Sequence, residues 1–171
     1  MNSLLFDFSA NKETKTITIK REFAARLPLV WDAFTKSELL DQWWAPKPWK
    51  AVTKTMDFRE GGSWHYAMVG PEKQEHWGLV NYQSIIHEQR ITAFDMFTDA
   101  EAKVNEQLPQ SKWIMSFNAQ NETTLYEGLI IFDHLEQLEA TIKMGFKEGM
   151  TMALENLDQY FAAQFKLENK L

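Results

Sequence analysis

The sequence predicts an α+β fold in which a curved antiparallel sheet closes around a long C-terminal helix. Two patterns carry this prediction. Between residues 50 and 132, alternating or continuous apolar runs are separated by turn sequences, as expected for an antiparallel meander. Residues 138–165 instead repeat apolar side chains every three or four positions, which is typical of a helix with one buried face.

The chain is expected to begin with a polar leader, residues 1–14, followed by one domain over residues 15–167. At 171 residues and 44% hydrophobic composition, it has enough apolar surface for one core and little room for a second domain. The alternation in Thr16–Phe23 predicts the first strand.

Two short helices are expected after this strand. Pro28 is suited to the first turn of a helix. The predicted buried side carries Val30, Trp31, Phe34 and Leu39. Ser37 is expected to cap a second helix, Glu38–Trp43, and Pro46 is expected to end it.

Six strands are predicted in the middle of the chain. They are Lys50–Phe58, Ser63–Val69, Glu75–Ile86, Arg90–Thr98, Lys112–Ala119 and Thr123–Phe132. Short links that are polar or contain glycine favour hairpins between them. The longer, more charged segment 99–110 is interpreted as a mobile loop. In the predicted C-terminal helix, Gly145 and Gly149 each cost roughly 1 kcal/mol against alanine, which indicates close packing or room beside the helix.

Charge and composition disfavour several classes of function. A formal net charge of −6 argues against binding to nucleic acids or anionic membranes. The absence of cysteine excludes disulfides and thiolate ligands, and it fits a reducing compartment. No signal peptide is recognised, and no apolar run approaches the roughly 18 residues that cross a bilayer. We therefore expect a cytoplasmic protein, monomer or homodimer, without nucleic-acid or membrane partners.

The segment Leu39–Trp49 is rich in aromatic residues. Trp43 and Trp44 are adjacent, and Trp49 follows two prolines. Adjacent indoles on a short helix point in different directions, and each buries roughly 150–250 Å². We expect one of the pair to lie in the core and the other to border a groove or cavity. Trp44 and Trp49 are both candidates for the cavity, and only one of them is expected to contact a ligand.

Three groups of residues form a recognisable pattern between residues 16 and 165. The first comprises Arg21, Phe23, Ala25, Val30, Trp31, Ala33, Phe34, Thr35, Glu38, Trp43, Trp44 and Pro46. The second comprises Asp57, Phe58, Arg59, Gly61 and Gly62. The third comprises Phe146, Gly149, Leu154 and Leu157. Together they resemble the START-like (SRPBCC, birch-pollen-allergen-like) superfamily, in the branch named after the activator of the 90-kDa heat-shock protein ATPase. Met150 stands where that branch usually has tryptophan.

The resemblance implies a helix-grip fold, in which a curved sheet holds the C-terminal helix and a cavity lies between them. Members of the superfamily bind lipids, sterols and other hydrophobic ligands. Some act as cyclases or aromatases, and the named branch includes a cochaperone. A shared fold does not by itself transfer any of these functions.

Large side chains on the predicted strands and helix are the candidates for the cavity wall. Period-2 alternation places Trp64, Tyr66 and Met68 on one face. The further candidates are Phe94, Met96, Trp113 and Met115 on strands, and Phe146 and Met150 on the helix. Ordinary core packing is the alternative. The orientation of Arg90–Thr98 stays open, because both of its faces are apolar.

No metal site, cofactor or catalytic residue is predicted. The four histidines lack the spacing of metal ligands on a helix or strand. The motifs of nucleophilic, metalloprotease and nucleotide-binding sites are missing. Glu127, in an otherwise apolar strand, is the ionisable candidate for the cavity. Desolvation there would raise its pKa, whereas on the solvent face it would be unremarkable.

The leading functional hypothesis is non-catalytic binding of a small hydrophobic or aromatic molecule in this cavity. The second is a cochaperone-like module that acts on a heat-shock ATPase. The third is a cyclase- or aromatase-type enzyme, which requires an ionisable side chain facing the cavity.

Overall fold

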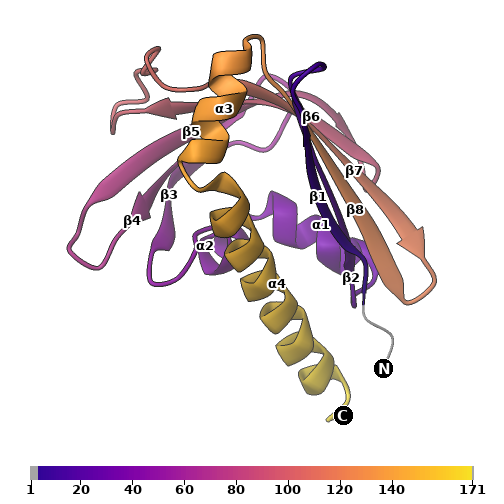
Figure 1. Cartoon of the computed structure of the whole chain (residues 1–171). Helices are drawn as coiled ribbons and strands as arrows, with labels where there is room; N and C mark the ends of the chain where they lie inside the picture. Colours follow the sequence, from indigo (N-terminus) through magenta and orange to yellow (C-terminus); the bar gives the residue numbers. More distant parts are fainter. Residues whose placement is uncertain (1–3, 171) are drawn as a thin grey trace.

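The computed structural model describes residues 4–170. In chain order its elements are β1 (Phe6–Asn11), β2 (Thr16–Phe23), α1 (Leu27–Thr35), α2 (Ser37–Trp43), β3 (Lys50–Met56), β4 (Ser63–Val69), β5 (Glu75–Ile86), β6 (Arg90–Thr98), β7 (Ser111–Gln120), β8 (Thr123–Ile131), α3 (Leu135–Lys143) and α4 (Phe146–Glu168). The eight strands form one sheet in the order β1-β2-β8-β7-β6-β5-β4-β3, so the sheet is not closed. It curves around α4, which confirms the predicted α+β helix-grip fold (Figure 1).

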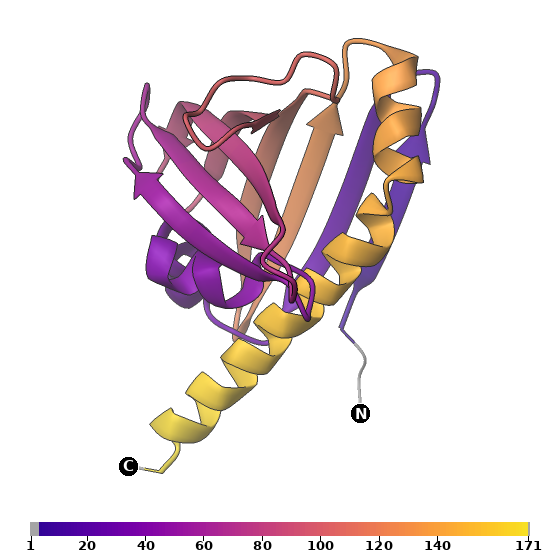
Figure 2. The same ribbon diagram turned by 90° about the vertical axis from the view of Figure 1, so that its left-hand side faces the viewer.

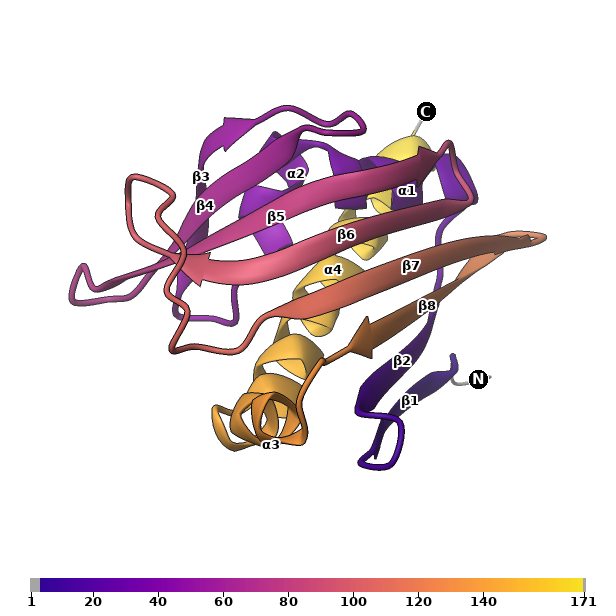
Figure 3. The same cartoon turned by 90° about the horizontal axis from the view of Figure 1, so that it is seen from above.

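The middle of the chain folds into the predicted antiparallel meander. Strands β3 to β7 each pair with the next one along the chain, and β8 also pairs with β2. Figure 3 shows this sheet from above, with α4 crossing beneath it. The loop of residues 99–110 is tied to the end of β6 by a bridge between Thr98 and Val104. Its mobility stays a prediction.

The N-terminal segment differs from the predicted polar leader. Residues 6–11 form the edge strand β1, which pairs antiparallel with β2 along its whole length. Phe6 and Phe8 are its only large apolar residues, so the alternation is too short to recognise without the neighbouring strand. The ring of Phe8 lies 6.0 Å from that of Phe146 on α4. Residues 1–3 of the leader lie outside the described residues.

The prediction of one continuous helix over residues 138–165 is wrong, because the chain breaks into α3 and α4. Gly145 between them has a φ of 88°, a left-handed conformation that glycine adopts without steric cost. After this break, α4 runs diagonally beneath the sheet and extends past it (Figure 2). The predicted apolar stripe is confirmed in the middle of α4, where Ala153, Leu157 and Phe161 are buried.

The two predicted short helices, α1 and α2, are present, but Ser37 does not cap α2. Lys36 alone separates the two helices. It is the C-cap residue of α1 and the N-cap residue of α2. Ser37 is therefore already the first helical residue, and no side chain caps α2. Its hydroxyl instead lies 3.4 Å from the carboxylate of Glu38.

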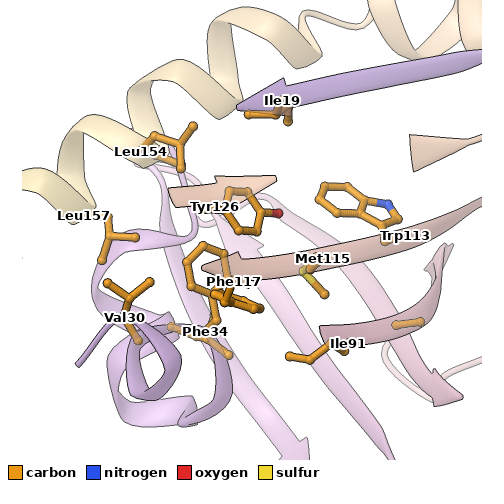
Figure 4. Close-up of a cluster of buried hydrophobic side chains, with 14 of the residues drawn as sticks. Ile19, Val30, Phe34, Ile91, Trp113, Met115, Phe117, Tyr126, Leu154 and Leu157 are labelled. Atoms are coloured by element: carbon orange, nitrogen blue, oxygen red, sulfur yellow. The ribbon is translucent and has the colours of Figure 1, made fainter. Parts of the chain in front are cut away.

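The filled part of the interior lies between the sheet, the two short helices and the middle of α4 (Figure 4). The ring of Phe34 lies 4.9 Å from Trp43 and 4.7 Å from Tyr126. Leu154 and Leu157 of α4 close the same cluster and are fully buried. Because protein interiors of this kind are close-packed, a larger open volume is expected toward the other end of the sheet, near α3.

We expect opposite effects from alanine at the two glycines of the C-terminal segment. Gly145→Ala forces a β-carbon into the left-handed conformation and lowers the free energy of unfolding by roughly 1–2 kcal/mol. Gly149→Ala raises it by up to about 1 kcal/mol, because this residue lies inside α4. The nearest atom to the added β-carbon is Pro46 Cγ at 3.8 Å, an ordinary contact. Urea denaturation measures both variants, and equal effects would contradict the left-handed break.

Candidate functional site

A cavity of about 370 Å³ lies between the concave face of the sheet and the junction of α3 with α4. Small-molecule sites typically have volumes of roughly 300–1,000 Å³. The middle of α4 packs into the core, whereas its first turns border the cavity. Gly145 and Gly149 both line the cavity, and their missing side chains leave part of this space open.

Most of the residues predicted for the cavity wall line it. Those from the sheet are Tyr66, Met68, Met96 and Trp113. Those from the helices and the loop after α2 are Trp44, Trp49, Phe146 and Met150. The wall is therefore mainly aromatic and methionine side chains, which come from both layers of the fold.

The other four predicted residues lie elsewhere. Trp64 and Met115 border a separate inner void of about 30 Å³. Phe94 lies on the outer face of the sheet, where Lys112 Nζ is 5.9 Å from its ring centroid. Glu127 alternates with inward-facing neighbours and also lies on the outer face. Phe94 and Glu127 are therefore not part of the cavity wall.

The register of β6 settles which of its faces points inward. Asp95 lies directly opposite Val80 of β5 and Ser111 of β7. Val80 borders the inner void and Ser111 the cavity, and Asp95 borders both. Sequence reasoning missed Asp95 because Phe94 and Met96 flank it and made both faces look apolar. The available signal was a single carboxylate inside an otherwise largely apolar run.

Asp95 is the acid of the cavity. Burial away from water raises the pKa of its carboxyl from 3.8 to about 7, and the backbone N–H of Met96 offsets part of this rise. No lysine or arginine lines the cavity, and within residues 4–170 no ion pair involves Asp95. The carboxyl of Asp95 therefore ionises near neutral pH, and no lysine or arginine in the cavity wall balances the charge. Such groups are concentrated at functional sites.

Tyr66 links Trp44 to the surroundings of Asp95. The indole Nε1–H of Trp44 donates to the Tyr66 hydroxyl at 3.0 Å, which leaves the hydroxyl proton for another acceptor. Burial, and next the charge of Asp95, raise the pKa of Tyr66, so the hydroxyl stays protonated. The Tyr66 ring lies over Gly78, where an added β-carbon would come within 2.8 Å of it. The absence of a side chain at Gly78 thus leaves the room that the ring occupies.

The adjacent indoles serve different parts of the interior, as predicted. Trp43 is 1% exposed, and its Nε1–H donates to the backbone carbonyl of Ala33 at 2.8 Å. Trp44 instead borders both the cavity and the inner void. Trp49 lies near the mouth, where its ring centroid is 4.9 Å from that of the exposed His76. Both candidate indoles, Trp44 and Trp49, therefore reach the cavity.

The part of the chain that the structure describes holds no cluster of three or more His, Cys, Asp or Glu side chains suited to a metal ion. His65, for example, is 4% exposed. Its Nε2 lies 3.2 Å from the Thr98 hydroxyl and 3.1 Å from the Asp99 carbonyl, which gives it a structural role. Over the same residues, no helix combines the length and the apolar character needed to cross a membrane.

Comparison with known proteins places the chain in a family. The model of the family described as "Activator of Hsp90 ATPase homolog 1-like protein" matches residues 24–162. The chain belongs to this family. The match covers both short helices, the whole meander and most of α4, so the START-like resemblance is confirmed across the elements that form the cavity. No curated protein sequence matches the chain.

Solved structures share this fold. A crystal structure of a protein from Mycobacterium smegmatis has a TM-score of 0.84 at 25% identity, covering 92% of this chain and 96% of that one. A solution structure from Arthrobacter aurescens has a TM-score of 0.84 at 26% identity, covering 89% and 88%. The AHSA1 protein from Silicibacter pomeroyi has a TM-score of 0.69 at 18% identity, covering 87% and 99%, and shows likeness in fold alone. Members of this fold family commonly bind ligands or act on Hsp90, and fold does not decide between these roles.

The raised pKa of Asp95 predicts a pH-dependent effect on stability. The folded protein holds this proton more tightly than the unfolded chain, so stability falls as pH rises from about 4 to about 7 and stays lower above that. Asp95→Asn removes this loss. We expect the variant to melt at a higher temperature than the unsubstituted protein at alkaline pH, and the difference to vanish near pH 4.

Glu127→Gln is the matched control, because it removes a carboxyl from the outer face with the same change in charge. Thermal unfolding monitored by circular dichroism over this pH range measures both variants. An increase in melting temperature of equal size in the two variants would contradict the desolvation of Asp95. So would an increase in Asp95→Asn that does not vary with pH.

Proposed function

We propose that the protein binds a small hydrophobic or aromatic molecule in the cavity between the sheet and the C-terminal helices, without catalysing its conversion. The observation that carries this proposal is a preformed space of about 370 Å³ with a mainly aromatic and methionine wall. Sites for small molecules are typically concave, mostly apolar and provided with a few polar groups that orient the ligand. Here those polar groups are Asp95, Ser111 and the Tyr66 hydroxyl.

The arrangement of the wall favours flat or aromatic ligands. The ring of Trp113 lies 6.1 Å from that of Trp44 and 6.0 Å from that of Phe146, in tilted and edge-on geometries. A further ring gains the same offset or edge contacts at separations of about 4.5–7 Å. Met68 and Met150 supply flexible side chains that adapt to the outline of a ligand.

Thermal shift and native mass spectrometry against a panel of hydrophobic and aromatic metabolites test the proposal. We expect one or more aromatic compounds to raise the melting temperature and to form a complex of one molecule per chain. Gly149→Leu places a side chain at the cavity and reduces or abolishes the ligand-induced shift.

Glu155→Leu is the matched control, because it adds the same side chain at an exposed position of α4. This variant should keep the ligand-induced shift. A panel that leaves the melting temperature of the unsubstituted protein unchanged and gives no complex contradicts the proposal.

A second candidate function is a cochaperone-like action on a heat-shock ATPase. Its support is the family match, whose description names an activator of the Hsp90 ATPase. Apolar side chains on the outer face of the sheet offer this role a contact surface: Val52 is 51% exposed and Phe94 39%. Hsp90 ATPase turnover measured with and without the protein tests it, with Phe94→Ser expected to reduce any stimulation. The absence of both binding to the ATPase and stimulation of its turnover would eliminate this candidate.

A further inference from the structure

Among the residues that the structure describes, the cavity wall contains one acid and no lysine or arginine to neutralise it. Asp95 enters the wall from β6, opposite Ser111, in surroundings that are otherwise mainly aromatic. Two indoles border both the cavity and the inner void together with Asp95, and their N–H groups are already engaged. Trp44 donates to Tyr66, and Trp113 donates to the hydroxyl of Ser111 at 3.0 Å. These groups therefore do not serve as donors to the carboxylate.

Resting on the proposed binding function, we infer that the cavity prefers ligands that carry a cationic nitrogen on an apolar or aromatic body, with the Asp95 carboxylate as the counter-ion. A neutral ligand leaves the ionised carboxylate without a counter-ion in apolar surroundings, which costs free energy. A protonated amine forms charge-assisted hydrogen bonds with it, and these are about twice as strong as neutral ones.

The rings that surround Asp95 also suit a cation. Trp44 and Trp113 border the cavity and the inner void together with Asp95, and their centroids are 6.1 Å apart. Indole faces attract cations within about 6 Å of the ring centroid, most strongly where water is excluded. The formal net charge of −6 adds a general attraction for cations over the whole molecule.

This preference depends on pH. The titratable groups around Asp95 are Tyr66 of β4, Tyr82 of β5 beside the inner void, and His76 of β5 at the mouth. Residues of β7, β8 and the helices that line the cavity contribute none. Burial raises the pKa of Tyr66 and Tyr82, so both stay neutral. As pH falls through about 7, Asp95 becomes neutral, and this loss of negative charge weakens the binding of a cation.

Isothermal titration calorimetry with matched pairs of probes tests the inference. Each pair joins one ring system, either phenyl, indolyl or naphthyl, to an ethylamine or to the corresponding ethanol of nearly equal size. We expect the amine of a binding pair to have a dissociation constant about tenfold or more below that of the alcohol at pH 8. Lowering the pH to 5.5 should remove most of this difference.

Asp95→Asn should lose both the preference for the amine and its dependence on pH. Alcohol binding that remains in this variant shows that the cavity is intact. Glu127→Gln should keep the preference, because that carboxyl lies on the outer face. His76→Gln removes the histidine at the mouth. If the preference for the amine still depends on pH in this variant, the titrating group is Asp95.

The outcomes separate the two proposals. Alcohols that bind as tightly as amines, or an amine preference that survives in Asp95→Asn, overturn the inference about cationic ligands and leave the binding function standing. Failure of both members of every pair to bind contradicts the binding function itself.

Discussion

The paired indoles of Trp43 and Trp44 set the boundary between the filled core and the cavity. Trp43 donates its N–H to a backbone carbonyl of α1 and packs on Phe34, which joins the two short helices to the core. Trp44, one residue later, donates to Tyr66 on the sheet and borders the cavity. Because both N–H groups are satisfied, each large ring is held in one orientation without an unpaired buried donor.

The break between α3 and α4 has a matching effect on the opposite side of the cavity. The buried middle of α4 is fixed by the aromatic core, so the helix cannot move toward the sheet at its N-terminal end without disturbing that packing. There, Gly145 turns the chain and Gly149 presents no side chain. Met150 occupies the position where the family pattern usually has tryptophan, and its smaller, flexible side chain leaves space beside the sheet.

A carboxyl with a pKa of about 7 in an apolar cavity is a cost to the folded state at physiological pH. Stability and ligand recognition therefore make opposing demands on Asp95. A cation that enters the cavity would recover the lost free energy, which links binding to stabilisation. Asp95 also supplies the ionisable group that an enzymatic use of the cavity requires. Its aromatic surroundings, with a hydroxyl from Tyr66 and one from Ser111, favour recognition.

Local patterns in the sequence determined the fold class, the six-strand meander, both short helices and most of the cavity wall. Period-2 alternation, turn residues and a helical apolar stripe depend on neighbouring residues alone, so they can be recognised without the partner elements. The adjacency of Trp43 and Trp44 likewise indicated two surfaces. Only the tertiary structure decided the edge strand β1, the break at Gly145 and the inward orientation of Asp95. Each of these depends on a neighbour distant in sequence: β2 completes β1, packing against the sheet directs the C-terminal helices, and the register with β5 and β7 chooses the face on which Asp95 lies.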